Sequence, residues 1–314
     1  MPNTNNSLLI HRAEGALLGH ALGNALGLGY ESCSRETLPF IDRLAMPGRF
    51  LPPGSWSDDT GLMLSLAYSL LEKGFEPEDQ MLRYLAWQDK KADKRCWPLE
   101  TPPPPLGSST QAALEKFRHT DEVFSGNTSN YSAGNGGLMR LLPLVIWNLN
   151  LADEGKFLQQ VADATRTTHG SLICIEASQL LALLLRHILL RDETAEIETC
   201  LLAFADAYWE DEDIGALAAG DYLTKPEAAI RSGGYVLETL EAALWAFSTS
   251  STAKEALITA VNLGGDCDTV AAITGSLAGA WYGVEQLPED WLDDLVEASS
   301  IKALGKKLLK GAAA

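Results

Sequence analysis

The amino-acid sequence predicts an all-α protein with one compact helical domain, which we place at residues 8–312. Apolar residues recur at three- and four-residue spacing along most of the chain, and no segment shows the alternation typical of a β-strand. No shift in composition marks a boundary between domains. The 314 residues, 46% of them hydrophobic, are sufficient to bury a sizeable core.

Two polar loops interrupt this helical spacing. One is the proline run at residues 102–105, and the other is a polar, glycine-bearing stretch at residues 125–135. The segments predicted to be helical are, in order, residues 9–27, 60–73, 76–91, 108–118, 137–149, 171–190, 194–209, 235–247, 253–262, 269–282 and 290–310.

Glycines recur every four residues near both ends of the chain. They are Gly15, Gly19, Gly23 and Gly27 in the first helix, and Gly275, Gly279 and Gly283 in a later one. On a helix this spacing forms a ridge of small residues. Because a glycine inside a helix costs about 1 kcal/mol, we expect the ridges to serve close packing between the first helix and the helix after Asp268.

The net charge of -18 argues against a nucleic-acid-binding surface and against docking on anionic membranes. An anionic small ligand stays compatible with this charge if metal ions and backbone N–H groups receive it. The five cysteines include no C-x-x-C pair, and neither a signal peptide nor an uncharged apolar stretch of membrane-spanning length is evident. We therefore expect a reduced, cytoplasmic protein.

Two short acidic motifs stand directly before apolar helical runs. They are Trp56-Ser57-Asp58-Asp59-Thr60 and Gly264-Gly265-Asp266-Cys267-Asp268-Thr269, and neither has a Lys or Arg within five residues. If the fold gathers the four carboxylates in one pocket, they repel one another unless they are protonated or neutralised by a cation. Oxygen ligands favour Mg²⁺ or Mn²⁺. The alternative is helix capping, which each motif alone could serve.

Two further segments carry polar chemistry. Residues 132–140 form a glycine-rich loop that opens a helix, and such a loop can present N–H groups to a phosphate or be a plain surface turn. His169, within Thr167-Thr168-His169-Gly170, precedes a long apolar helix and could be a ligand or a capping residue.

Together, these segments and their order resemble the ADP-ribosylglycohydrolase family, of the dinitrogenase-reductase-activating glycohydrolase type. The resemblance spans roughly residues 12 to 295. The matching segments are residues 15–27 for the opening helix, 57–60 for the first metal motif, 134–140 for the ligand loop, 168–169 for the following helix start, 262–269 for the second metal motif, and 279–288 near the end.

The resemblance implies an all-α fold that holds two divalent ions, Mg²⁺ or Mn²⁺, in a cleft and cleaves ADP-ribose from modified proteins. The metal ligands it implies are Ser57, Asp58, Asp59, Asp266, Asp268 and Thr269. The residues it implies along the ribose and diphosphate path are Ser132, Gly134, Asn135, Gly136 and His169, with Tyr235 as an aromatic surface for adenine. The resemblance also implies a water that the metals would activate and that would attack the anomeric carbon. The base is Glu31 or one of Asp58, Asp59 and Asp268.

The sequence departs from the family pattern at four positions, none of which removes an implied metal ligand. Asn24 stands where Asp is usual, Ser57 where Thr is common, Gly61 where a larger polar residue is frequent, and Cys267 where a small hydroxyl residue is common. The Asn24 amide removes one negative charge beside the metal motifs and so affects how they are positioned.

The resemblance favours a hydrolase that acts on arginine-linked ADP-ribose, although the sequence alone leaves the linked atom open. A metal-dependent prenyl-chain enzyme is a rival, but neither motif has its Asp-Asp-x-x-Asp spacing. A rival from another class is an immunity-type protein that binds and blocks an ADP-ribosyltransferase toxin, since the acidic surface suits a basic partner. The two roles can coexist, and the intact ligand set favours catalysis.

Overall fold

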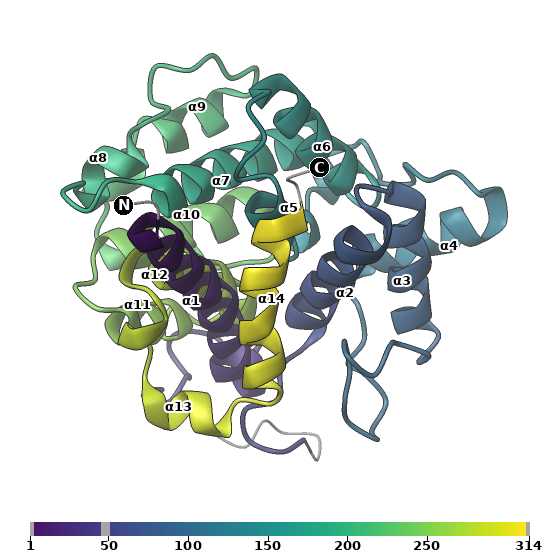
Figure 1. The fold of residues 1–314 in the computed structure, drawn as a ribbon, viewed down its shortest axis with the longest axis horizontal. Coiled ribbons are helices and arrows are strands. Elements are labelled where there is room, and N and C mark those ends of the chain that lie inside the picture. The colour runs from purple at the N-terminus through teal and green to yellow at the C-terminus, as the bar shows by residue number, and fades with distance from the viewer. Residues whose placement is uncertain (1–2, 45–50, 312–314) are drawn as a thin grey trace.

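The computed structural model describes residues 3–44 and 51–311, and Figure 1 shows helices packed around one another. Within these ranges there are fourteen α-helices and no β-strand, apart from two isolated β-bridges. The all-α prediction is therefore confirmed. Ala312, the last residue of the predicted domain, lies outside the described residues.

The helices follow the predicted order, with six short 3₁₀ helices between them. The α-helices are α1 (Asn3–Gly27), α2 (Asp58–Lys73), α3 (Pro77–Gln88), α4 (Ser108–Thr120), α5 (Leu142–Trp147), α6 (Glu154–Arg166), α7 (Leu172–Leu190), α8 (Ile197–Leu201), α9 (Glu212–Ala218), α10 (Val236–Ser248), α11 (Ala253–Val261), α12 (Cys267–Tyr282), α13 (Glu289–Asp294) and α14 (Ala298–Gly311). The 3₁₀ helices are η1 (Leu28–Tyr30), η2 (Asn130–Ser132), η3 (Asn135–Gly137), η4 (Asp221–Thr224), η5 (Glu227–Ala229) and η6 (Val284–Gln286).

The glycine ridges lie in the most extensive helix–helix contact of the described chain, in which α1 lies along α12 (Figure 1). A Cβ atom on Gly19 would lie 2.1 Å from the Gly275 carbonyl oxygen, and one on Gly23 would lie 2.0 Å from that of Ala271. Backbone atoms cannot move aside as a side chain can, so only glycine fits here. A Cβ atom on Gly27 would lie 2.4 Å from Cα of Asp268, so the contact extends to the second acidic motif.

Some helices were not predicted, and some predicted helical segments are shorter in the structure. The sequence interpretation missed α6, although Asp153 caps it by accepting a hydrogen bond from Lys156 N and Phe157 and Val161 are buried one turn apart. It also missed the short helix α9. Among the predicted segments, 137–149 is helical only as α5 and the short η3, and 194–209 only as α8.

The predicted helix at residues 290–310 is two helices, α13 and α14. The chain between them pairs with a distant loop, since Val296 N donates to Gly54 O over 3.1 Å and Trp56 Nε1 donates to Val296 O over 3.1 Å. Glu297 has a positive φ of 60°, which is incompatible with a continuous helix. A tertiary contact therefore overrides the local helical pattern.

Helix α7 is the one helix within the described ranges that is long and apolar enough to cross a membrane, with a mean hydropathy of 1.7 over its most apolar window. It carries Glu176 and Arg186, and 72% of that window is buried inside the protein. It packs as a core helix against α6 and α12.

Three tryptophans connect the first acidic motif to the proline run. Trp56 and Trp87 each make an edge-to-face contact with Trp97, with ring centroids 5.5 and 5.6 Å apart. The Trp87 ring Nε1 donates a 3.0 Å hydrogen bond to Pro104 O. A Cβ atom on Gly61 would lie 2.0 Å from the Trp87 ring, which explains why glycine follows the first motif in this chain.

Candidate active site

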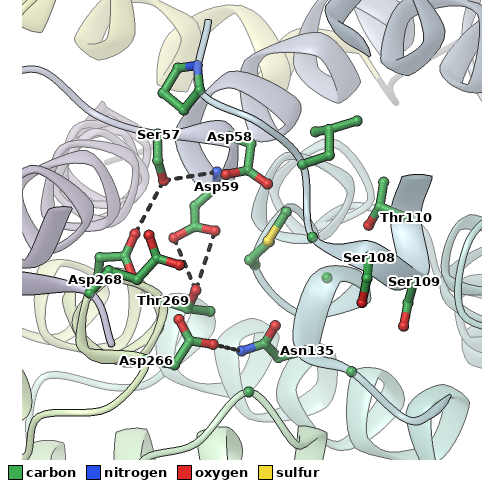
Figure 2. Close-up of a pocket in the computed structure, with 18 of the residues that line it drawn as sticks. Ser57, Asp58, Asp59, Ser108, Ser109, Thr110, Asn135, Asp266, Asp268 and Thr269 are labelled. Carbon is green, nitrogen blue, oxygen red and sulfur yellow. Dashed lines mark hydrogen bonds between the residues drawn. The ribbon is translucent and has the colours of Figure 1, made fainter. Parts of the chain in front are cut away.

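The two acidic motifs line one pocket, although more than two hundred residues separate them in sequence (Figure 2). The cavity has a volume of about 340 Å³, within the usual range for small-molecule sites. The predicted site residues that line it are Glu31, Ser57, Asp58, Asp59, Gly134, Asn135, Gly136, His169, Asp266, Asp268 and Thr269.

The first motif is formed by the start of α2. Ser57 is the N-cap residue, and its Oγ accepts a hydrogen bond from Asp59 N. Because serine caps the helix, the carboxylates of Asp58 and Asp59 are not needed for capping and remain available to the pocket. The predicted capping role therefore falls to Ser57 and not to either aspartate.

A glycine turn forms the second motif at the start of α12. Gly264 and Gly265 have positive φ angles of 71° and 65°, a region that favours glycine. Backbone hydrogen bonds fix the turn, from Asp266 N to Ser232 O and from Gly265 N to Cys33 O, both 2.7 Å long. Asp266 occupies the N-cap position, but its side chain makes no capping bond.

Hydrogen bonds join the two motifs across the pocket floor (Figure 2). Thr269 Oγ1 donates to the Asp59 carboxylate, 3.2 Å from Oδ2 and 3.3 Å from Oδ1. Ser57 Oγ donates to Asp268 Oδ2 over 3.3 Å. One hydroxyl of each motif thus donates a hydrogen bond to a carboxylate of the other motif.

Glu31 brings a further carboxylate to the pocket mouth. Oxygens of Glu31, Asp266 and Asp268 lie within 4.8 Å of one another, a spacing that could hold a metal ion. The neighbouring Ser32 N donates a 2.7 Å hydrogen bond to Gly265 O and so ties the loop that carries Glu31 to the second motif.

The electrostatics of the pocket call for positive charge. Burial, followed by the charges of Glu31 and Asp266, raises the pKa of Asp58 to about 7. Burial and the neighbouring carboxylates likewise raise the pKa values of Asp59 and Asp268 well above their usual range. Among the residues that the structure describes, none lies in hydrogen-bonding geometry with the buried Oδ1 of Asp268. A cluster of oxygen ligands with one orphaned carboxylate oxygen fits divalent metal ions better than it fits a metal-free protein.

The glycine-rich loop forms the opposite side of the pocket. Asn135 Nδ2 donates to Asp266 Oδ2 over 2.6 Å and to Thr239 Oγ1 over 2.9 Å, so the loop is tied to the second motif. A Cβ atom on Gly136 would lie 2.6 Å from the His169 ring, which shows how tightly that ring supports the loop.

His169 is buried, with 3% of its surface exposed, and this burial favours the neutral imidazole. Burial lowers its pKa to about 3, and its Nδ1 lies 2.8 Å from the hydroxyl of Thr168. Its place against the glycine-rich loop is compatible with the predicted position along the ligand path.

Two predicted ligand residues lie outside the cavity that holds the carboxylates. Ser132 lines a neighbouring groove together with Lys116. Tyr235 is 39% exposed, and its backbone forms a β-bridge with Gly134. Any contact of these two side chains with a ligand would therefore be at the rim of the pocket.

Sequence reasoning missed one wall of the pocket, formed by residues 104–110. The Trp87 hydrogen bond to Pro104 O positions this wall. The nearby backbone of Gly107 moderates the rise in the pKa of Asp58. The sequence feature that could have indicated the wall is the proline run that ends one residue, Leu106, before Gly-Ser-Ser at the start of α4. Asn24, noted only as a departure from the pattern, lies under both motifs.

The fold and the pocket together define an all-α protein with an acidic site of the kind that holds divalent metal ions. The chain belongs to the ADP-ribosylglycohydrolase family, hydrolases that remove ADP-ribose, because the family model matches residues 5–314.

Relatives and a solved structure resemble the chain over most of its length. It is 31% identical to the ADP-ribosylarginine hydrolase Tri1 of Serratia proteamaculans, over 95% of this chain and 79% of that protein. It is 28% identical to the ADP-ribosyl-[dinitrogen reductase] glycohydrolase of Rhodospirillum rubrum, over 90% of each. A solved structure described as an ADP-ribosylglycohydrolase-related protein complex is 38% identical, with a TM-score of 0.83 over 98% of this chain and 99% of that one.

Proposed function

We propose that this protein is a metal-dependent hydrolase that removes ADP-ribose from modified arginine side chains of proteins. The observation that carries the proposal is the pocket itself, in which both acidic motifs and Glu31 converge. Within the described part of the chain, the buried Oδ1 of Asp268 has no hydrogen-bond partner there. The likeness to two hydrolases named for ADP-ribosylarginine, at 31% and 33% identity, supports arginine as the linked residue.

The ligand set supports two Mg²⁺ or Mn²⁺ ions. Oxygen ligands would come from Ser57, Asp58 and Asp59 in the first motif and from Asp266, Asp268 and Thr269 in the second. When bound, such ions supply positive charge to the carboxylates and lower the pKa of a bound water.

The residues of the chain divide the remaining work. Gly134 N and Asn135 N already donate to Ser132 O and Gly234 O. The N–H of Gly136, which lines the pocket, is therefore the group of this loop that would receive the diphosphate without adding a positive side chain. A water molecule attacks the anomeric carbon while the bond to the guanidinium nitrogen breaks, and the departing nitrogen takes up a proton.

Glu31 is the best-placed base for this step. It lies at the exposed mouth of the pocket, next to Asp266 and Asp268. The Asp59 carboxylate is buried and accepts hydrogen bonds from Thr269 and Asn24, so it is less accessible than Glu31 to a water at the pocket mouth.

The test is hydrolysis of arginine-linked, serine-linked and DNA-linked ADP-ribose, each with Mg²⁺, with Mn²⁺ and with a chelator. We expect metal-dependent release of ADP-ribose from the arginine-linked protein and little from the other two. Release from the serine-linked protein alone would retain the hydrolase and overturn the arginine assignment. No release from any substrate would overturn the hydrolase.

A second candidate function is the binding and blocking of an ADP-ribosyltransferase, which the net charge of -18 favours for a basic partner. A metal-ligand variant such as Asp268→Ala separates the two functions, because it abolishes hydrolysis but leaves a blocking surface intact. Inhibition of a transferase by this variant would establish blocking, and its absence would exclude it.

A further inference from the structure

Asn24 is a fully buried amide on α1, directly beneath the two acidic motifs. Its Oδ1 accepts hydrogen bonds from Ser57 N over 2.8 Å and from Thr60 Oγ1 over 3.0 Å. Both donors belong to the first motif. This half of the amide therefore fixes where α2 begins.

The other half of the amide faces carboxylates of both motifs. Asn24 Nδ2 donates to Asp59 Oδ2 over 2.8 Å and to Asp268 Oδ2 over 3.2 Å, and it also lies 2.8 Å from Ser57 Oγ. An amide nitrogen has only two hydrogens, so three acceptors share them. Asn24 thus belongs to neither motif yet is hydrogen-bonded to both.

A carboxylate at this position would behave differently. One of its oxygens could still accept from Ser57 N, but the other would have no hydrogen to donate. It would lie close to Asp59 Oδ2 and Asp268 Oδ2, at the 2.8 and 3.2 Å that Nδ2 now spans. Without metal this adds like-charge repulsion in a buried place, and with metal it adds attraction.

We propose that Asn24 is a positioning residue that holds Asp59 and Asp268 at their working separation before any metal binds. Its neutral amide stabilises the metal-free pocket and weakens the affinity for divalent ions relative to an aspartate at the same place. This inference rests on the proposed two-metal site.

The experiment compares the wild type with Asn24→Asp and Asn24→Ala. The melting temperature is measured in chelator, and Mg²⁺ and Mn²⁺ affinities are measured by calorimetry. The matched control is Asn148→Asp, because Asn148 is also buried and donates to an acceptor, Gln160 Oε1 at 2.8 Å, but lies outside the pocket.

We expect the two variants to move metal affinity in opposite directions. Asn24→Asp melts several degrees lower in chelator and binds metal on the order of tenfold more tightly or better. Asn24→Ala also melts lower in chelator but binds metal more weakly, because the carboxylates lose their shared donor. Asn148→Asp lowers the melting temperature equally with and without metal.

Two results would overturn the inference in distinguishable ways. If the wild type binds metal but Asn24→Asp has the same metal affinity and the same melting temperature in chelator, Asn24 does not determine these two properties. The proposed function would still stand. If wild type binds no divalent metal, both are overturned. An Asn24→Asp protein that folds only with metal supports the inference. If Asn24→Asp does not fold at all, the metal affinity of Asn24→Ala decides the question. An Asn24→Ala affinity equal to that of the wild type would then overturn the inference.

Discussion

The two acidic motifs occupy the same local position, the first turn of a helix, but the protein restrains them by different means. The first is held by side chains, because Ser57 caps α2 and Asn24 accepts from its backbone. The second is held by backbone, because Gly264 and Gly265 form a turn with positive φ that bonds to Ser232 and Cys33. Side-chain restraint can be altered by substitution without moving the chain, whereas backbone restraint cannot.

Removing a metal-ligand carboxylate from either motif should have the largest effect. Asp268→Ala and Asp58→Ala should each lower hydrolysis on the order of a thousandfold, because metal charge at the reacting centre is lost. In chelator both variants should melt at or above the wild-type temperature, because repulsion among the carboxylates is relieved.

Initial rates and melting curves test this, with the exposed Asp290→Ala as the control. Unequal losses would show that one motif carries more of the chemistry. Wild-type rates in a variant with normal metal content would refute the assigned ligand roles.

The second prediction concerns the contact between α1 and α12, the two helices that lie beneath both motifs. Gly19→Leu and Gly279→Leu should each destabilise the protein by about 3 kcal/mol or more, because the added atoms meet backbone at 2.1 and 2.0 Å. Denaturant unfolding measures the effect. Gly215→Leu in α9 is the control, since nothing lies within 4 Å of its Cβ position. An unchanged unfolding free energy in both variants would mean that the helices do not pack this closely in solution.

The third prediction is a pH dependence of the metal-free protein. The folded-state pKa of Asp58 is raised to about 7, and those of Asp59 and Asp268 are raised as well, relative to about 3.9 in an unfolded chain. The folded state therefore binds these protons more tightly. Their contribution to stability is complete below about pH 4 and is lost as the pH rises through about 7.

In chelator the free energy of unfolding should thus fall by about 3 kcal/mol or more between pH 4.5 and 7.5, and Mg²⁺ should restore it at the upper end. Below about pH 4, ion-paired carboxylates with lowered pKa values, such as Asp93 and Glu72, reverse the trend. Urea titrations at several pH values measure the slope, and Asp58→Asn should flatten it. If the unfolding free energy of Asp58→Asn has the same pH dependence as that of the wild type, Asp58 does not contribute to it.

Features of the fold and of the site could be predicted from the sequence where a short sequence pattern determines them. The pairing of α1 with α12 was predictable, because a four-residue glycine repeat has few other uses in a long helix. The two acidic motifs could be recognised as a candidate metal site because four carboxylates without a nearby cation stand out. The gathering of both motifs in one pocket then confirmed the geometric part of that hypothesis.

Features that depend on tertiary contacts were not predictable. The wall at residues 104–110 follows from the Trp87 contact with Pro104, and the break between α13 and α14 follows from Val296 pairing with Gly54. Asn24 could be recognised as unusual, but only its five hydrogen-bonding contacts reveal its place between the motifs.

The smallest expected effects test the comparison of the motifs most directly. Gly265→Ala should destabilise the protein by about 2 kcal/mol, because a left-handed backbone costs a non-glycine residue roughly 1–2 kcal/mol and the new Cβ would lie 2.4 Å from Ser232 O. Ser57→Ala should cost about 1 kcal/mol, the usual value for a lost N-cap. Gly215→Ala, in an open helical position, should be neutral or slightly stabilising.

The metal affinities of Ser57→Ala and Gly265→Ala provide a second comparison of the two motifs. Ser57→Ala keeps the backbone of its motif and should weaken metal binding only modestly, by the loss of one hydroxyl ligand. Gly265→Ala displaces the turn that carries Asp266 and should weaken metal binding more than its stability change alone accounts for. If Ser57→Ala proves the more damaging on both measurements, the side-chain cap and not the glycine turn is the stricter restraint, and the contrast between the two motifs is reversed.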